Sequence, residues 1–471
     1  MDSLAASVAA VASFLSDYTL VPLLLIAAVY FTVVTRGVQF GMIGEMLRLL
    51  LRSGRRAGHI GGHHSVSSFQ AFAISIASRV GTGNLAGVAS AIAIGGPGAV
   101  FWMWVIALLG AASAFAESTL AQLFKVRGER SFMGGPAYYI LHGLHNRAWA
   151  VTFAILITLT FGFAFNTVQA NTIADAVEMS FGIPRLWVAG VMTALTLAII
   201  CGGIRRISRF SEMIVPAMAI AYIVLALVIV AINIHRFPEV VALIFENAFG
   251  FHQALGGTVG SAMIMGIKRG LFSNEAGEGS TPNAAATADV SHPVKQGLIQ
   301  ALGVYTDTLL ICSCTAFIIL CSGLYLEGHD GIVLTQRAID AGLGMNGSTI
   351  GSTFVTIAIF FFAFTSIVAN YYYGETNLRF IRNSGLLINS YRIVVGVMVF
   401  GGSLVSLDLV WGFADVTMAL MTLCNLAAIV ALSKLVVILL RDYKAQRPLG
   451  DPVYRRSTIP SIAADTPCWP E

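Results

Sequence analysis

Apolar segments long enough to cross a lipid bilayer recur along the whole chain, and they limit what it can fold into more than any other feature. A spanning helix needs about 20 mostly apolar residues, and the sequence contains about eleven such segments. Since 56% of the residues are hydrophobic and only 11% are charged, one soluble core could not bury this much apolar surface. We therefore predict an all-α polytopic membrane protein. The expected spans cover residues 18–35, 67–94, 97–124, 148–174, 185–203, 211–233, 255–290 with an interruption, 296–325, 350–376, 391–407 and 410–440.

The distribution of basic residues predicts how these spans are oriented. Lys and Arg concentrate in cytoplasmic loops, and an outside N-terminus puts 20 of the 28 basic residues in segments that then face inward. The opposite orientation would put those 20 residues outside. We therefore expect an odd number of spans, with the N-terminus outside and the C-terminus inside. The net charge of +4 then reflects membrane topology, and no nucleic-acid partner is predicted.

One span contains a stretch that an ordinary membrane helix would not carry. Residues 79–88, RVGTGNLAGV, place three glycines, a threonine and an asparagine within seven positions. Irregular backbone at membrane depth is tolerated only where protein covers it or water reaches it, because lipid cannot satisfy the freed N–H and C=O groups. Secondary transporters hold substrate carboxylates and coupling cations at such breaks. Alternatively, the glycines only allow close helix packing, although packing alone does not account for Thr82 and Asn84.

A second break is expected in the span at 255–290. Residues 266–289, GIKRGLFSNEAGEGSTPNAAATAD, place charged side chains among glycines at a depth where charge is costly and indicates function. Alternatively, Lys268 and Arg269 belong to a cytoplasmic loop and the span ends early. If the first span is an extra helix, each break falls in the first helix of a five-helix set. This is the sequence pattern of an inverted-repeat transporter with its site between the breaks.

These observations predict how the chain is organised. The segment at 37–57 mixes Leu and Met with Arg, which suits a helix lying on the membrane surface. Alternatively, it is a solvated loop helix. The end of the chain is rich in proline and charge, which is typical of disorder. The predicted units are an N-terminal transmembrane helix with an interfacial segment at 1–60, a first five-helix repeat at 61–236, a second at 237–440 and a disordered cytoplasmic tail at 441–471.

Three stretches of the chain resemble a known transporter family. Residues 95–110, GGPGAVFWMWVIALLG, look like the signature of the sodium:alanine symporters over their full length. Residues 166–174, NTVQANTIA, and 269–286, RGLFSNEAGEGSTPNAAA, are typical of the same family, and the resemblance runs from about residue 18 to 440. It implies a LeuT-type fold in the bacterial cytoplasmic membrane, with two inverted five-helix repeats plus one N-terminal helix. It also implies import of a small neutral amino acid with Na⁺ as coupling ion and no other cofactor. We expect the protein to be a monomer.

The resemblance also implies a cation site. Na⁺ prefers oxygen ligands, and the LeuT-type pattern takes them from the first and eighth core helices. The implied ligands are the carbonyl groups of Ala77 and Val80 and the hydroxyl groups of Thr365 and Ser366. Without the resemblance, a Thr and a Ser in an apolar span would be interpreted as bonded to their own helix backbone.

The resemblance places the substrate at the first break, where backbone N–H groups would meet its carboxylate. The implied N–H donors are those of Thr82, Gly83 and Asn84. The implied lining residues are Asn166 and Gln169, three apart on one face of the third core helix, and Gly266, Gly270 and Asn274 from the second break.

One position departs from the family pattern. Members often show a Trp-containing sequence just before the YYGE run, whereas IVANYYYGE here puts Asn370 before Tyr371. If that position faces the pocket, a flat apolar wall has become a hydrogen-bonding one. We therefore expect that the substrates, besides alanine and glycine, include serine or glutamine.

The charged residues near the breaks leave a further question open. Glu275 and Glu278 could pair with basic residues as a gate or as a structural lock. The candidate partners are Arg79, Lys268 and Arg269.

The sequence gives less support to other classes of function. An intramembrane hydrolase would need a nucleophile and base, or metal ligands, inside the bilayer, but all nine histidines fall in predicted loops or at span ends. An aspartate protease would need two facing membrane aspartates, and Asp307 has no evident partner. No GxxxxGK[ST] phosphate loop occurs, so direct ATP drive is not expected. An H⁺-coupled symporter and a passive channel stay open as alternatives.

Overall fold

The computed structural model describes residues 11–55, 66–128, 131–250, 259–344, 350–405 and 407–471. Among these residues the regular structure is helical except for one two-stranded antiparallel sheet and an isolated bridge between Val66 and Ala288. The sheet pairs β1 (Val126–Arg127) with β2 (Phe132–Met133). The predicted helical class is confirmed.

The helices follow the predicted spans closely. The first part of the chain forms η1 (Phe14–Leu20), α2 (Val21–Val34), α3 (Val38–Gly41), α4 (Ile43–Arg55), α5 (Ser68–Arg79), η2 (Gly83–Gly87), α6 (Val88–Gly95), α7 (Gly98–Leu123), α8 (Pro136–Leu144), α9 (Arg147–Leu159), η3 (Thr160–Phe165), α10 (Asn166–Phe181), α11 (Arg185–Ile200), α12 (Ile204–Ile232), η4 (Ile234–Arg236) and α13 (Phe237–Ala248). The second part forms α14 (Val259–Asn274), α15 (Thr281–Ala285), α16 (Pro293–Val304), η5 (Tyr305–Cys312), α17 (Ser313–Ser322), η6 (Leu324–Leu326), α18 (Gly331–Gly342), α19 (Ile350–Ile381), α20 (Gly385–Gly402), α21 (Leu407–Ala431), α22 (Ser433–Gln446), η7 (Arg447–Leu449), η8 (Arg456–Thr458) and η9 (Pro460–Ile462).

Eight helices within the described residues are long and apolar enough to cross a membrane. Three further predicted spans are shorter in the structure. α11 has 16 residues, and the two interrupted spans are each divided into shorter helices. The multi-pass architecture is therefore confirmed, while the count of eleven spans stays a prediction.

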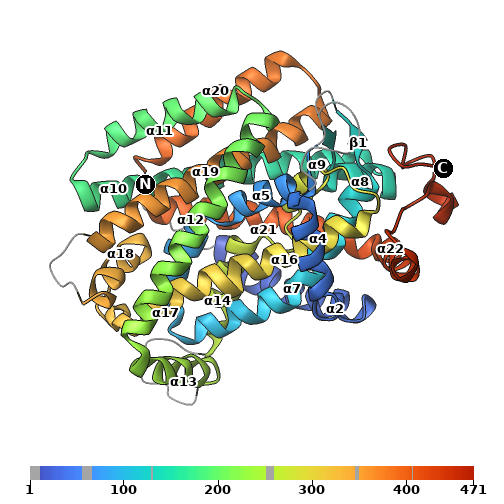
Figure 1. Ribbon diagram of the computed structural model, residues 1–471. Coiled ribbons are helices and arrows are strands. Elements are labelled where there is room, and N and C mark those ends of the chain that lie inside the picture. The colour runs from blue at the N-terminus through green and yellow to red at the C-terminus, as the bar shows by residue number, and fades with distance from the viewer. Residues whose placement is uncertain (1–10, 56–65, 129–130, 251–258, 345–349, 406) are drawn as a thin grey trace.

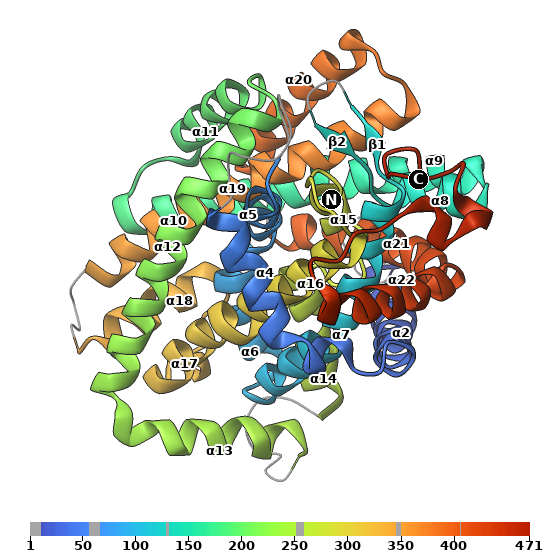
Figure 2. The same cartoon turned by 45° about the vertical axis from the view of Figure 1, so that its right-hand side comes forward.

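The long helices form two groups. In the first, which contains α5–α6, α7, α14–α15 and α16–α17, α7 packs against both α14 and α16. In the second, which contains α9–α10, α11, α19 and α20, α10 packs against α19 and α20. Figure 1 shows α10, α11, α19 and α20 across the upper part of the molecule, with α7, α14 and α16 below them. α12 crosses between the groups and contacts α5, α17 and α19, and Figure 2 shows it as a diagonal rod.

The first break lies where the sequence predicts it. α5 begins with a capping box, in which the Ser67 hydroxyl and the Gln70 side chain each accept a backbone N–H from the other residue. The helix stops at Val80, whose φ of −80° and ψ of 93° are extended. A helix resumes at Gly83. The segment between these two helices is the irregular backbone expected of a discontinuous membrane helix.

The second break is longer and depends on left-handed backbone. α14 ends at Asn274, and Glu275, Gly277 and Gly279 then have φ values of 55°, 86° and 85°. Glycine adopts this region without penalty, whereas a side chain such as that of Glu275 rarely does. Helix resumes at Thr281. The breaks at 79–88 and 266–289 are thus both confirmed.

The last predicted span is wrong at its C-terminal end. We expected it to run over 410–440, but α21 ends at Ala431 and a separate helix, α22, begins at Ser433. α22 buries Val436, Leu439 and Tyr443 while its other side carries charge. The apolar residues of α22 belong to the packed face of an amphipathic helix, which a hydropathy run alone does not distinguish from the end of a span.

The segment after α22 is packed, in contrast to the disordered tail that we expected. Tyr454 is fully buried, and its N–H donates to the carbonyl of Ser291 at 2.8 Å. The indole N–H of Trp469 donates to the carbonyl of Leu123 at 2.9 Å. The average composition is that of a disordered chain, but a few aromatic anchors and backbone hydrogen bonds hold this segment against the helices.

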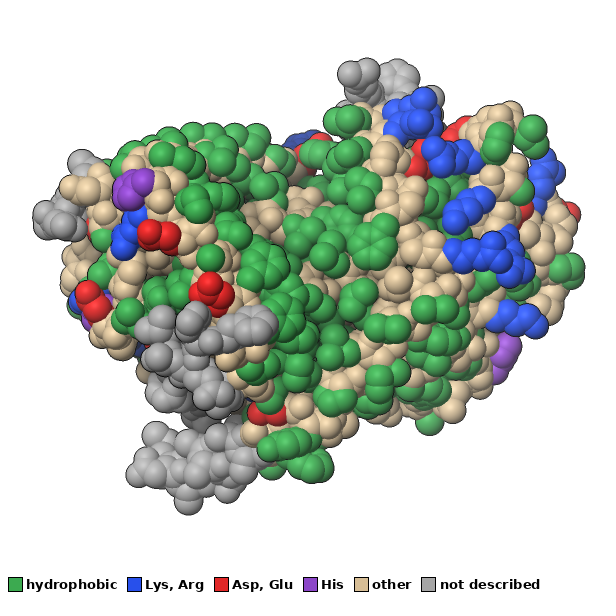
Figure 3. All heavy atoms as spheres, turned by 90° about the horizontal axis from the view of Figure 1, so that it is seen from below, with side chains coloured by type: hydrophobic (Ala, Val, Ile, Leu, Met, Phe, Trp, Pro, Cys, Tyr) green, Lys and Arg blue, Asp and Glu red, His purple; other side chains and the backbone are tan. Residues whose placement is uncertain are grey.

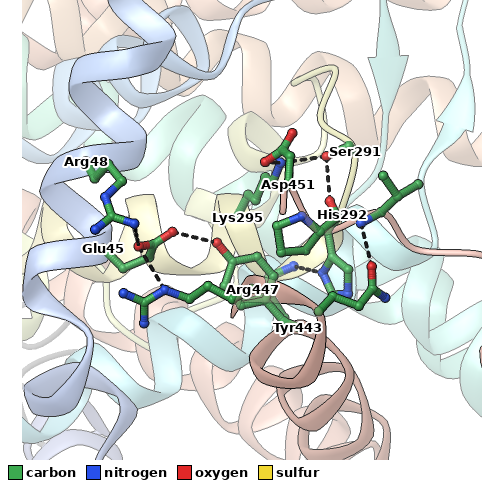
Figure 4. A network of polar contacts seen from close by, with 12 residues as sticks. Glu45, Arg48, Ser291, His292, Lys295, Tyr443, Arg447 and Asp451 are labelled. Atoms are coloured by element: carbon green, nitrogen blue, oxygen red, sulfur yellow. Dashed lines mark hydrogen bonds and ion pairs between the residues drawn. The ribbon is translucent and has the colours of Figure 1, made fainter. Parts of the chain in front are cut away.

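A network of polar contacts joins α22 to the rest of the molecule (Figure 4). The Glu45 carboxylate of α4 accepts from the Tyr443 hydroxyl at 3.0 Å and pairs with Arg447 at 3.2 Å. On the other side of α22, Asp442 lies 3.1 Å from the Nε2 of His292, the residue before α16. The C-terminal segment is therefore attached both to α4 and to the start of α16.

Charge is distributed unevenly over the surface. In Figure 3 the Lys and Arg side chains gather at one end of the molecule, and hydrophobic side chains cover the middle. The ends of α7, α19 and α22 and the β1–β2 hairpin lie at that end in Figure 1. We call it the basic end.

Candidate functional site

The backbone N–H groups of the first break are held by two side-chain amides. The N–H of Gly81 donates to Oδ1 of Asn84 at 2.9 Å. The N–H and the hydroxyl of Thr82 both donate to Oε1 of Gln169, at 2.9 and 2.8 Å. Gln169 comes from α10, so the structure brings one of the predicted lining residues into contact with the predicted donors. The Gln169 oxygen therefore occupies the Thr82 N–H, one of the donors predicted for a carboxylate.

Three oxygen atoms converge beside these N–H groups. The Ser366 hydroxyl of α19 is 2.8 Å from the carbonyl oxygen of Ala77 and 3.4 Å from that of Val80. These three groups, which we call the oxygen cluster, are buried. They come from the two helices that the resemblance in the sequence implied. Neutral carbonyl and hydroxyl oxygens of this kind suit a hard monovalent cation.

The fourth implied cation ligand is bonded differently. The Thr365 hydroxyl donates to the carbonyl of Phe362 on its own helix at 2.8 Å. This is the local bond that the alternative interpretation of the sequence expected. A hydroxyl that donates its hydrogen keeps its oxygen lone pairs, so a role for Thr365 in cation binding stays a prediction.

Asn370 lies between the two breaks. The Ser78 hydroxyl, at the end of α5, is 2.8 Å from Oδ1 of Asn370 and 2.5 Å from the Glu275 carboxylate. The other oxygen of Glu275 accepts from the Ser280 hydroxyl at 2.6 Å. Asn370 is fully buried, and its NH₂ group has no hydrogen-bond partner among the described residues. It therefore offers two donors inside the core of the molecule.

A buried carboxylate that we did not assign to the site connects the two broken helices. Asp307, in η5, accepts from the Asn84 amide at 2.7 Å through one oxygen. Through its other oxygen it accepts from the hydroxyls of Ser273 and Thr308, at 2.8 and 2.9 Å. Asn84 belongs to the first break and Ser273 to the end of α14, so Asp307 contacts both. The signal in the sequence was a lone carboxylate in an apolar span.

A second carboxylate, Glu117 of α7, caps the second break. Its two oxygens accept the backbone N–H groups of Gly277 and Gly279, at 3.1 and 3.0 Å. The Asn425 amide of α21 donates to Glu117 at 2.8 Å and to the carbonyl of Gly277 at 2.9 Å. Unwound backbone at membrane depth needs such partners. We did not predict Glu117 from the sequence, although it too is an acidic residue inside an apolar span.

The basic residues near the breaks pair with other groups than those proposed from the sequence. Lys268 lies 3.0 Å from Asp415 of α21, and Arg269 lies 3.5 Å from the same carboxylate and over the Trp411 ring. The Arg79 guanidinium donates to the carbonyl of Gln300 at 3.2 Å. No ion pair of Arg79, Lys268 or Arg269 with Glu275 or Glu278 occurs in the described structure.

Three glycines that we predicted at the substrate site approach neighbouring helices closely. A Cβ added at Gly83 would meet Cα of Ser273 on α14 at 3.0 Å. A Cβ at Gly266 or Gly270 would collide with α7. The four-residue spacing of Gly266 and Gly270 is that of close helix packing, so packing accounts for both glycines, and their role in lining the substrate stays a prediction. Gly81 is the glycine that faces the site, because a Cβ there would lie 2.7 Å from the Gln169 oxygen and still closer to the Ser366 hydroxyl.

The two remaining predicted residues are buried and hydrogen-bonded locally. Asn166 donates to the carbonyl of Gly162 at 3.1 Å, and its Oδ1 has no partner among the described residues. Asn274 donates to the Thr308 hydroxyl at 3.1 Å and accepts the N–H of Ala276 at 3.0 Å. Asn274 thus caps the end of α14, while Asn166 keeps an unsatisfied acceptor.

Solved transporters share this architecture. The structure of MhsT in complex with L-phenylalanine matches with a TM-score of 0.58, covering 86% of this chain and 93% of that chain, at 13% sequence identity. At this identity the likeness shows the fold alone. With two discontinuous helices joined by buried polar groups, the chain is a multi-pass helical protein with the LeuT-type fold.

Sequence comparison gives the family. The profile described as the sodium:alanine symporter family matches residues 1–456. The amino-acid carrier protein AlsT of Bacillus subtilis is 52% identical over 434 residues, covering 92% of this chain and 91% of AlsT. The probable sodium/glutamine symporter GlnT of the same organism is 49% identical over 453 residues, covering 96% and 93%. The chain belongs to the sodium:alanine symporter family, and is an amino-acid symporter rather than an enzyme.

Proposed function

We propose that this protein imports small neutral amino acids by Na⁺ symport through alternating access. The observation that carries the proposal is that the oxygen cluster lies beside the N–H groups of Gly81 and Thr82. A cation held by the cluster attracts a carboxylate to these donors. The bound ion therefore strengthens substrate binding electrostatically, and the bound substrate strengthens ion binding. Thr365 supplies a further oxygen from the same turn of α19 as Ser366, the residue that α19 contributes to the oxygen cluster.

The side chains around the first break suit the rest of an amino acid. When a carboxylate binds the Thr82 N–H, the Gln169 amide turns and donates its NH₂ group to the ligand. The unsatisfied Oδ1 of Asn166 accepts from a substrate ammonium group, and Asn370 offers donors to a polar side chain. We therefore propose alanine, glycine, serine and glutamine as substrates. The name of GlnT, a probable sodium/glutamine symporter, supports glutamine.

The topology that we propose puts the basic end in the cytoplasm and the N-terminus outside. The gathering of Lys and Arg at one end supports it, because cytoplasmic loops are the basic ones. The two inverted repeats are residues 61–236 and 237–440, each opening with a discontinuous helix. The transporting unit in this proposal is a monomer surrounded by lipid.

A second mode of coupling is favoured by one observation. Asp307 is a buried carboxylate that contacts both broken helices. A carboxylate in this position can neutralise a second cation or take up a proton, and intramembrane acidic residues serve as proton relays in other transporters. H⁺ coupling is therefore the alternative to coupling by Na⁺ alone.

Uptake by the purified protein in liposomes tests both modes. We expect an inward Na⁺ gradient at equal pH to drive accumulation of alanine or glutamine. Ser366→Ala should weaken the apparent Na⁺ affinity. Ser403→Ala is the matched control, since this buried serine also donates to its own helix and reaches the carbonyl of Ala170 on another.

The uptake experiment distinguishes Na⁺ symport from H⁺ symport and from passive flux. Accumulation driven by a pH gradient without Na⁺ would replace Na⁺ coupling with H⁺ coupling. Flux that never exceeds equilibration would contradict symport altogether. An unchanged Na⁺ response in Ser366→Ala would place the cation outside the oxygen cluster.

A further inference from the structure

A pocket of about 700 Å³ opens at the basic end, and none of the residues proposed above for substrate or cation lines it. Its walls come from the β1–β2 hairpin with α8, the start of α9, the turn between α11 and α12, and the turn between α19 and α20. Figure 2 shows the hairpin beside α8 and α9. The pocket is therefore a separate feature of the second helix group.

Four arginines line this pocket: Arg127, Arg147, Arg379 and Arg392. Glu375 is the one carboxylate among the described lining residues, and it pairs with Arg379 at 2.8 Å. The Arg392 guanidinium donates to the Tyr371 hydroxyl at 3.0 Å, a neutral partner. Burial lowers the pKa of His142 at the rim, so this side chain adds no charge near pH 7. The lining thus holds an excess of positive charge.

Two of the arginines make no ion pair with a described residue. Arg127 and Arg147 are exposed, and Arg127 hydrogen-bonds the thiol of Cys468, a neutral partner. They enter the pocket from different elements, β1 and the first turn of α9. Guanidinium groups converging from separate elements recognise the oxygens of a phosphate group through charge-assisted hydrogen bonds.

The bottom of the pocket is polar and buried. Tyr372 and Thr376, one turn apart on α19, both line it. Tyr372 is 5% exposed, and no hydrogen bond of good geometry reaches its hydroxyl from the described residues, although Ser131 and Thr376 lie beside it. A buried hydroxyl without a good partner provides a donor for an oxyanion in the pocket.

The position of the pocket fits a lipid. Spanning helices α9, α12, α19 and α20 all begin or end around it, so it lies at the level where a membrane changes from hydrocarbon to headgroups. Apolar side chains of these helices, such as Val151 and Ile204, form part of its wall. Leu386, at the start of α20, is 79% exposed, as expected of a side chain that faces lipid. Charge and apolar surface therefore meet in one cavity.

We propose that this pocket binds the phosphate group of an anionic ligand and that a phospholipid headgroup supplies it. The arginines hold the phosphate, and the apolar wall contacts the glycerol and upper acyl chain. The occupied pocket ties the α19–α20 turn to the β1–β2 hairpin. The site is independent of the substrate site, so its failure and the failure of Na⁺ symport are separate results.

The test uses the full chain in mixed micelles in which phosphatidylglycerol replaces phosphatidylcholine stepwise. The melting temperature is followed against the mole fraction of phosphatidylglycerol. The test variant is Arg127→Gln with Arg147→Gln, and Arg127→Lys with Arg147→Lys keeps the charge. The control is Arg382→Gln with Arg441→Gln, which removes the same charge from two exposed arginines of the basic end that do not line the pocket.

We expect phosphatidylglycerol to raise the melting temperature of the wild type and of the control. Because each basic residue near an anionic lipid contributes roughly fivefold in affinity, the glutamine pair in the pocket should raise the half-saturating fraction about tenfold or more, with a smaller change in the control. The lysine pair should recover most of the effect. Inorganic phosphate is titrated in parallel at constant ionic strength.

Each outcome decides the proposal. Stabilisation by inorganic phosphate that the glutamine pair abolishes, with no preference for phosphatidylglycerol, would keep phosphate recognition and assign a soluble anion as its source. Equal stabilisation by both lipids together with no response to phosphate would overturn the proposal. An equal loss in the pocket pair and the control pair would also overturn it, because it would reduce the effect to general surface charge.

Discussion

Gly81→Ala is the substitution that tests whether ion and substrate bind at the first break. A Cβ at this position would lie 2.7 Å from Oε1 of Gln169, against 3.4 Å for an ordinary contact, and would press still harder on the Ser366 hydroxyl. Both atoms are at the ends of side chains that can rotate away. We therefore expect the variant to fold, at the lower end of the roughly 1–3 kcal/mol that overpacking a core costs.

The change should also weaken cation binding. The added methyl group displaces the Ser366 hydroxyl, so the cation loses one of the three oxygens of the cluster. At about 0.5–1.5 kcal/mol for one such contact, the apparent Na⁺ affinity should fall roughly 2- to 13-fold. Na⁺-dependent uptake in liposomes and Na⁺-induced thermal stabilisation measure this fall.

Two neighbouring glycines supply the controls. Gly87→Ala places its Cβ 3.7 Å from the nearest atom, so transport should be near normal. Gly83→Ala pushes on the backbone of Ser273 at 3.0 Å, which cannot rotate away, so stability and transport should fall together. If Gly81→Ala keeps the wild-type Na⁺ dependence and uptake, the reasoning that puts ion and substrate at this break is refuted.

Three further substitutions probe other groups. Asp307→Asn keeps the shape but removes the charge that links the breaks; if Asp307 carries the proton, uptake should lose its pH dependence, and an unchanged profile would exclude that role. Asn370→Trp removes two buried donors and should shift relative uptake from glutamine and serine toward alanine and glycine, by up to about tenfold for one hydrogen bond; identical ratios would put Asn370 outside the pocket. His292 has a pKa lowered by burial, its Nδ1 accepts the Val294 N–H at 3.2 Å, and its neutral form contributes stability. That stability should be lost as pH falls below about 6.5, the unfolded value; His292→Asn, which can still cap α16, should show a flatter melting profile between pH 7 and about 5.

Sequence alone located the breaks because they violate a strong rule. A membrane span rich in glycine and polar residues has few physical explanations, and the segments around Gly81 and Glu275 both proved irregular. The same reasoning could not tell which glycine does what. Gly81 approaches two polar side chains, while Gly83 approaches the backbone of another helix. The spacing of the two glycines along the sequence does not indicate this difference.

The buried acidic residues show why the polar contacts of the site could not be predicted from the sequence. An acidic residue in an apolar span is conspicuous, but its partners are set by the packing of helices that are remote in sequence. Asp307 accepts from Asn84, which precedes it by 223 residues, and Glu117 accepts from Gly277, which follows it by 160. A single sequence flags the unpaired group and leaves its partner undetermined. Since unwound backbone needs compensation, every break in a spanning helix implies such a distant partner, and acidic residues inside the remaining spans are the first places to look.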